Sequence, residues 1–147
     1  MKTITQTRYI VAPKETIWMV LLEDEFNRTW LAEFAPGTYF DTDWIIGHPL
    51  RLWDGSGGGR VGTIEEKRPY DRIEWVYDGI ITPEGSDDTT SLEAMQWKGG
   101  SEVFALASVE DGTLLTVSSD VSDASYDTMK IRWEAALDRI RELSLSV

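Results

Sequence analysis

The last quarter of the chain, from Ser122 to Val147, has the apolar spacing of an amphipathic helix. Its apolar residues recur at steps of three and four, which places them on one face of a helix with about 3.6 residues per turn. These residues are Tyr126, Met129, Trp133, Leu137, Ile140 and Leu143. Charged residues occupy the other side, so the pattern predicts one long helix whose apolar stripe is buried.

Most of the preceding chain alternates apolar and polar residues, which is the pattern of strands with one buried face. Turn signals such as Asp54-Gly55 and Asp111-Gly112 separate the runs, and strands joined by short turns pair antiparallel. The predicted strands are Lys2–Val11, Tyr39–Ile46, Pro49–Trp53, Gly59–Lys67, Arg72–Tyr77, Gly100–Val109 and Thr113–Val121. In the long connection from Thr82 to Gly99, the pattern is compatible with either a strand or a loop.

Two short helices are predicted after the first strand. Pro13 suits the first turn of a helix from Lys14 to Leu22, and acidic residues begin a second helix from Glu23 to Leu31. The sheet must cover the apolar stripe of the long helix. We therefore expect an α+β fold in which a curved antiparallel sheet wraps around the C-terminal helix, as a single domain over residues 1–147.

The composition narrows the classes of function. The chain is 41% hydrophobic and 27% charged, as globular proteins are, and its formal net charge is −12. This charge argues against nucleic acid and anionic membrane surfaces as partners, because both are bound through Lys and Arg. With no cysteine and a single histidine, we expect no metal site and no cofactor.

Two further expectations concern location and assembly. The first residues lack the apolar segment of a secretory signal, and no apolar run approaches the roughly 20 residues that span a membrane. We therefore expect a cytoplasmic protein, either a monomer or a homodimer.

Several short strings, in order along the chain, resemble the START-like (SRPBCC) superfamily, in the branch of the Hsp90 ATPase activator homologues. The string IVAPKETIW begins at Ile10, and Trp30 follows in the second helix. The strings GTIEE and PYDRI lie between residues 62 and 73, GTLLTV begins at Gly112, and Arg132-Trp133 precedes Leu137 by four residues. Arg132 and His48 stand where many members of the family have glycine.

This resemblance implies a helix-grip (START/Bet v1-like) fold. It also implies a hollow between sheet and helix that binds a small hydrophobic molecule, with no chemistry assumed. A chaperone-interacting module of the Hsp90-activator type is the second reading. The third is a cyclase-like or hydrolase-like enzyme that uses a polar residue inside the hollow.

The chain offers a large aromatic and apolar set for such a hollow, including three of its seven tryptophans. Alternation along the strands and the helical stripe select the expected ligand-binding residues: Trp44, Ile46, Leu52, Trp75, Tyr77, Phe104, Met129, Trp133 and Leu137. Binding pockets combine apolar walls with a few polar anchors, and His48, Arg51 and Gln96 are candidates for that role. A filled hydrophobic core is the alternative for each member of the set.

Two further features, the glycine-rich run and His48, are only weak indications of phosphate binding or catalysis. The glycine-rich run from Asp54 to Arg60 lacks the Gly-Lys-Ser/Thr ending of a phosphate-binding loop and precedes a strand, so we expect a hairpin tip. His48 lies between Gly47 and Pro49, with no nucleophile motif nearby, and is expected to be a turn residue. We therefore assign no catalytic residue.

Overall fold

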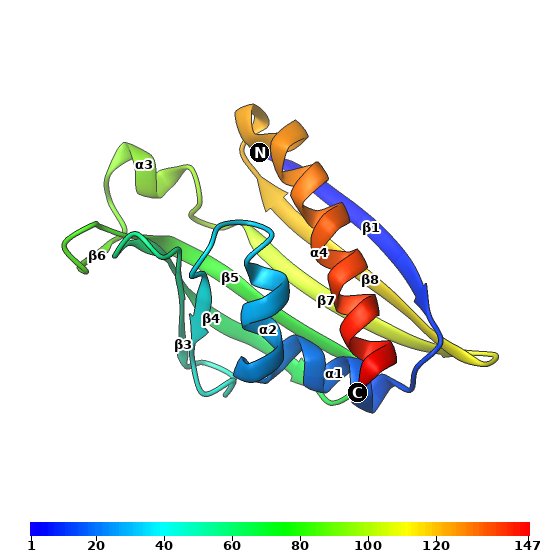
Figure 1. The fold of residues 1–147 in the computed structure, drawn as a ribbon. Helices are drawn as coiled ribbons and strands as arrows, with labels where there is room; N and C mark the ends of the chain where they lie inside the picture. The colour runs from blue at the N-terminus through cyan, green and yellow to red at the C-terminus, as the bar shows by residue number, and fades with distance from the viewer.

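The computed structural model describes residues 1–147 and has one antiparallel sheet of eight strands (Figure 1). The strand order is β1-β8-β7-β5-β4-β3-β2, and β6 pairs with β5. The elements are β1 (Lys2–Ile10), α1 (Lys14–Leu22), α2 (Asp24–Leu31), β2 (Tyr39–Asp41), β3 (Pro49–Trp53), β4 (Gly59–Arg68), β5 (Arg72–Ile81), β6 (Asp87–Asp88), α3 (Leu92–Met95), β7 (Ser101–Val109), β8 (Gly112–Val121), the single 3-10 turn η1 (Asp123–Ser125) and α4 (Tyr126–Ser146). None of the helices is both long and apolar enough to cross a membrane.

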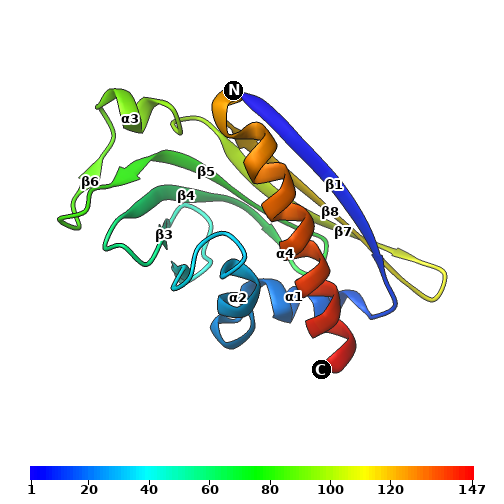
Figure 2. The ribbon, with the colours of Figure 1, turned by 45° about the horizontal axis from the view of Figure 1, so that its top comes forward.

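The sheet curls around α4, as the turned view shows (Figure 2). The expected α+β helix-grip architecture is confirmed, including the two short helices after the first strand. In both views α1 and α2 lie near the C-terminal end of α4, whereas α3 and β6 lie at the far end of β5. The region between α2, the first turns of α4 and this far end is where the site described below is found.

The predicted apolar stripe of α4 is confirmed, and it is buried most deeply in the middle of the helix. Trp133, Leu137 and Ile140 are buried in the core, whereas Tyr126 and Met129 in the first turns are only partly buried. The stripe packs on β1, α1 and α2. The first turns of α4 are therefore less completely covered than its middle.

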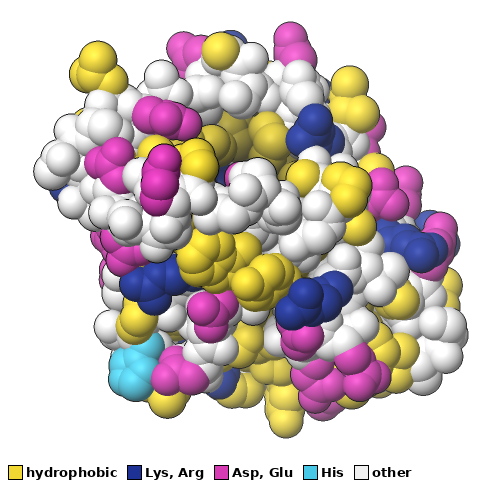
Figure 3. Space-filling view, turned by 60° about the vertical axis from the view of Figure 1, so that its left-hand side comes forward, with side chains coloured by type: hydrophobic (Ala, Val, Ile, Leu, Met, Phe, Trp, Pro, Cys, Tyr) yellow, Lys and Arg dark blue, Asp and Glu magenta, His cyan; other side chains and the backbone are white.

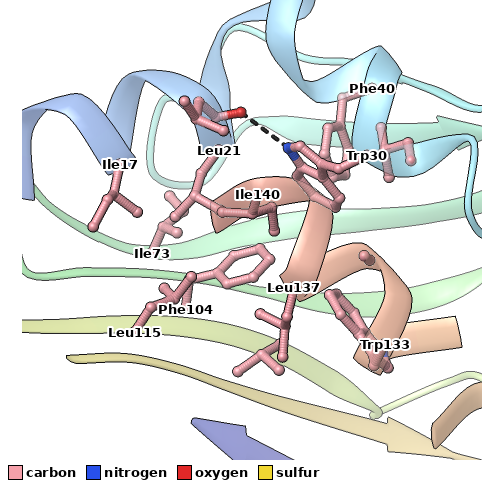
Figure 4. Packing of buried hydrophobic residues seen from close by; sticks show 14 of the residues in the cluster. Ile17, Leu21, Trp30, Phe40, Ile73, Phe104, Leu115, Trp133, Leu137 and Ile140 are labelled. Carbon is pink, nitrogen blue, oxygen red and sulfur yellow. Dashed lines mark hydrogen bonds between the residues drawn. The ribbon is translucent and has the colours of Figure 1, made fainter. Parts of the chain in front are cut away.

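Side chains from both short helices complete the core around α4 (Figure 4). Ile17 and Leu21 of α1 are fully buried, and Trp30 of α2 is also fully buried. The indole N–H of Trp30 donates to the carbonyl oxygen of Val20 at 2.9 Å. This bond satisfies the polar edge of a buried indole and fixes α2 against α1.

The predicted strand from Tyr39 to Ile46 is too long, because β2 ends at Asp41. Beyond it, the Thr42 hydroxyl accepts a hydrogen bond from the Trp44 backbone, and the Asp43 carboxylate accepts one from the backbone of Ile45. Such local side-chain bonds compete with strand pairing and favour a turn. Trp44 adopts a φ of +58°, which ends the extended backbone.

The segment from 82 to 99, for which strand and loop were both open, contains the two-residue strand β6 and the one-turn helix α3. The Asp88 carboxylate accepts hydrogen bonds from the backbone N–H groups of Thr90 and Ser91. The Ser91 hydroxyl then caps α3 by accepting from Ala94. β5 also extends four residues beyond the predicted Tyr77, because its end pairs with β6.

Candidate functional site

The main cavity has a volume of about 890 Å³ and lies between the helices and the far end of the sheet. One side is formed by α2, the segment after it and the first half of α4. The other is formed by β3, β4, β5 and the segment containing α3. In the space-filling view a hollow with hydrophobic side chains at its bottom opens on this side of the molecule (Figure 3). The volume is in the range of small-molecule pockets.

Aromatic side chains make up much of the cavity wall. Trp30, Phe34 and Trp133 come from the helical side, Phe40 from β2 and Trp97 from the segment after α3. The rings of Phe34 and Trp133 meet edge to face with centroids 4.7 Å apart. Such packing holds the rings in fixed orientations, so the wall is largely preformed.

The glycine-rich run is the tip of the β3–β4 hairpin, as expected, and it also forms part of the cavity rim. A side chain at Gly55, whose φ is +86°, would place its Cβ 2.4 Å from the Pro36 carbonyl oxygen. A Cβ at Gly58 would lie 2.8 Å from the carbonyl oxygen of Ile81. Glycine is therefore required for the hairpin tip to approach both neighbouring segments.

Two oppositely charged side chains, Arg60 and Glu102, belong to the cavity lining and lie deep in the structure. Arg60 is on β4 and Glu102 on β7, with Nη1 and Oε1 3.6 Å apart and side chains that are 18% and 5% exposed. Glu102 also accepts a hydrogen bond from the Ser119 hydroxyl at 3.3 Å. Burial raises the pKa of Glu102, and the charge of Arg60 opposes that rise.

The guanidinium of Arg60 also faces two aromatic rings. Its central carbon lies 4.3 Å from the ring centre of Trp97 and 5.0 Å from that of Tyr77. These cation–π contacts hold the side chain against the sheet. Burial raises the pKa of the Tyr77 phenol, so this group remains uncharged.

Two cavity-lining residues carry buried N–H groups with no hydrogen-bond partner. They are the Nη1 group of Arg60 and the Nε1 group of Trp133. Buried donors are normally paired, and leaving one unpaired is destabilising. Both side chains line the cavity, and the two N–H groups themselves are buried.

The outer part of the lining is mainly acidic. Asp54 and Glu93 are exposed and Asp88 is half-buried, whereas the only other cation is Arg132, whose Nη1 donates to the Phe34 carbonyl oxygen at 2.6 Å. Hydrogen bonds from Ser91 and Thr90 lower the pKa of Asp88. No group of three or more His, Asp and Glu side chains is placed to hold a metal ion.

The expected ligand-binding residues fall into three groups. Leu52, Met129 and Trp133 line the cavity. Trp75, Tyr77, Phe104 and Leu137 are buried in the core and do not line it. Trp44 packs edge to face on Phe40 and Trp75 and donates its indole N–H to the Leu22 carbonyl oxygen, while Ile46 is 56% exposed. Ile46 lies outside because the strand expected to carry it inward ends at Asp41.

The three candidate polar anchors all lie outside the cavity. His48, the only imidazole and cyan in Figure 3, is exposed, and its Nδ1 lies 2.6 Å from the Asp43 carboxylate. Arg51 pairs with Asp87 at 2.7 Å on the other face of β3, because alternation turns its neighbours Leu50 and Leu52 inward. Gln96 is exposed after α3.

Arg60 and Glu102 were not predicted from the sequence, although the position of Glu102 carried a signal. Glu102 has the same parity along β7 as the buried Phe104 and Leu106, so alternation places its carboxylate on the concave face. In the sheet it pairs with Trp75 on one side and Ser119 on the other. Arg60 follows the glycine-rich tip, where no periodic pattern assigns a face.

Solved structures with the same architecture are found in several bacteria. A crystal structure of a Mesorhizobium loti protein is 16% identical, with a TM-score of 0.75 over 97% of this chain and 96% of its own. The Aha1 dimer from Colwellia psychrerythraea is 18% identical, with a TM-score of 0.68 and coverage of 97% and 95%. CalU16 from Micromonospora echinospora is 21% identical, with a TM-score of 0.66 and coverage of 97% and 75%.

Likeness at these identities shows the fold alone, and this chain shares the helix-grip fold of those structures. No family model and no curated protein sequence matches the chain.

Proposed function

We propose that this protein binds a small, largely apolar molecule in the cavity between α2, α4 and the far end of the sheet. The observation that carries the proposal is a preformed space of about 890 Å³ whose wall contains five aromatic residues, with charged residues mainly at its outer part and at the Arg60–Glu102 pair. Such a space suits a rigid, flat or polycyclic molecule, because the rings offer broad apolar surfaces at fixed angles.

Apolar burial would supply most of the affinity. Each Å² of apolar surface removed from water contributes about 25 cal/mol, so a polycyclic ligand gains several kcal/mol before the cost of association. The unpaired N–H groups of Trp133 and Arg60 would orient the ligand by donating to an acceptor on it. Together these features support binding without a chemical step.

Binding is tested with a panel of polycyclic apolar probes, measured by titration calorimetry and by the melting temperature. A ligand that binds only the folded state stabilises it, by about 2.7 kcal/mol at one hundred times its Kd. We expect saturable binding of at least one probe and a matching rise in melting temperature. Failure of every probe in both measurements would refute the proposal.

A pair of variants tests whether the probe occupies this cavity. Met129→Trp adds bulk at a half-buried residue that lines the cavity. Ile131→Trp adds the same ring at a residue of α4 that is 67% exposed and does not line the cavity. We expect Met129→Trp to weaken binding about tenfold or more by filling the space, and Ile131→Trp to bind as the original chain does. Equal binding by both variants would place the probe elsewhere.

A second candidate function is acid–base chemistry on the bound molecule, favoured by the buried Glu102. A carboxyl group in a cavity, with its pKa raised by burial, is the kind of group that serves as a general base or acid. The ring opening of nitrobenzisoxazole begins with proton removal by a base, so it reports such activity. Acceleration that is lost in Glu102→Gln would favour an enzyme over a binding protein.

The chaperone-interacting reading stays a prediction. It expects this chain to recover an Hsp90-like chaperone in a pull-down and to alter its ATP turnover. No residue of the cavity bears on that reading.

A further inference from the structure

We propose that the ligand carries an uncharged polar group, such as a hydroxyl or a carbonyl, at the end that meets Arg60 and Glu102. The cavity would therefore select neutral molecules over carboxylates of the same shape. This inference rests on the proposed binding function and specifies the chemical class of its ligand.

The positive charge of Arg60 is already compensated within the protein. Glu102 lies 3.6 Å away, and the rings of Trp97 and Tyr77 face the guanidinium. A ligand carboxylate brought to this end would meet the guanidinium only by also meeting the Glu102 carboxylate. Two carboxylates that share a site repel each other, and the repulsion is strong where water is scarce.

The cavity lining as a whole also carries more negative than positive side chains. Four carboxylates, from Asp54, Asp88, Glu93 and Glu102, face two guanidinium groups. The second of these, Arg132, is bonded to a backbone carbonyl oxygen beside the cavity. The chain as a whole carries a net charge of −12, so an anion would approach against an unfavourable field.

An uncharged polar group on the ligand can use the hydrogen-bonding groups at the inner end of the cavity. The Arg60 Nη1 group is buried without a hydrogen-bond acceptor, and the Glu102 carboxylate is an acceptor that takes a hydrogen bond from Ser119. A ligand hydroxyl can accept from the first and donate to the second. A carbonyl can accept from Arg60 alone. Neither adds a charge that would need a partner.

Three probes that share one ring system test the inference: pyrenemethanol, pyrenecarboxylate and pyrenemethylammonium. Binding is followed at about pH 8, where an accessible carboxyl group is ionised, by energy transfer from the tryptophans to the pyrene. Titration calorimetry supplies the Kd values. We expect the neutral alcohol to bind most tightly and the carboxylate at least about tenfold more weakly, as for a charge left unpaired in a partly buried site.

Glu102→Gln then removes the carboxylate and leaves Arg60 charged. We expect the carboxylate probe to gain about tenfold or more relative to the alcohol, because Arg60 then lacks its counter-charge. The matched control is Glu110→Gln, which makes the same change in net charge at an exposed residue in the β7–β8 turn, outside the cavity. A distant exposed charge is screened, so we expect the control to leave the ratio of the two Kd values unchanged.

The outcomes separate this inference from the function on which it rests. If no probe binds, the binding function itself fails. If the probes bind but either charged probe binds as tightly as the alcohol, only the inference is overturned. The same holds if Glu102→Gln leaves the ratio of Kd values unchanged.

Discussion

Replacing Glu102 with Gln should change how the stability of the protein depends on pH. Burial raises the pKa of Glu102 in the folded state, so the folded chain keeps this proton to a higher pH than the unfolded chain does. The stability that comes from this difference is fully present below the unfolded pKa of about 4.3 and is lost as pH rises through the folded pKa. Gln has no such dependence.

The magnitude of this pH dependence follows from the titration of a single proton. Between the unfolded and the folded pKa, the stability of the original chain should fall relative to the variant by up to about 1.4 kcal/mol per pH unit. Below pH of about 4 the difference should be constant and small, because both side chains are then uncharged and similar in shape. Arg60 stays charged throughout and adds nothing to the slope.

The assay is urea unfolding of both proteins at a series of pH values, with the free energy of unfolding taken by linear extrapolation. The other carboxyl groups are common to both proteins and cancel in the difference. A difference that is independent of pH would refute the reasoning. So would a slope of the opposite sign, which would mean that the attraction of Arg60 outweighs burial and lowers the pKa of Glu102.

Three further predictions concern packing and the surface. Gly55→Ala and Gly85→Ala both force alanine into a φ of +86°, but only at Gly55 does a backbone oxygen lie 2.4 Å from the new Cβ. In chemical unfolding, Gly85→Ala should lower the free energy of unfolding by about 1 kcal/mol and Gly55→Ala by clearly more. Equal losses for the two variants would contradict the close approach at Gly55. Leu137→Ala, at a fully buried site, should cost about 2–5 kcal/mol, whereas Leu145→Ala, at a site 54% exposed, should change stability by about 0.5 kcal/mol or less by the same measurement. His48→Ala should leave the probe affinity measured by calorimetry unchanged, because the imidazole is exposed outside the cavity. A large loss of affinity would mean that the imidazole takes part in binding.

The architecture could be predicted because long-range periodicity determines it. Six positions of α4 repeat over the whole helix, and a stripe of that length has few ways to be buried other than under a sheet. The end of β2 could not be predicted in the same way. Thr42 and Asp43 fit a strand by composition, but their side chains bond to the backbone two residues ahead and turn the chain.

The cavity itself was harder to predict than the elements around it, since it depends on where apolar side chains are missing. Trp75, Phe104 and Leu137 were expected in its wall, yet they fill the core where α4 meets the sheet. The open space lies farther along, beside the half-buried Met129. A pattern of apolar residues identifies what is buried, and it does not distinguish a side chain that packs on another from one that faces a space.

The position of Glu102 shows how that distinction can be drawn from sequence. An acidic residue at an inward position of a central strand requires either a partner or access to polar surroundings, because an isolated buried carboxylate is strongly unfavourable. Here the partner is Arg60, from a strand two places away in the sheet, and the space beside the pair is the inner end of the cavity. Among inward positions of a curved sheet, a charged residue therefore indicates a cavity better than an aromatic residue does. An aromatic side chain is equally stable in a filled core, and a charged one is not.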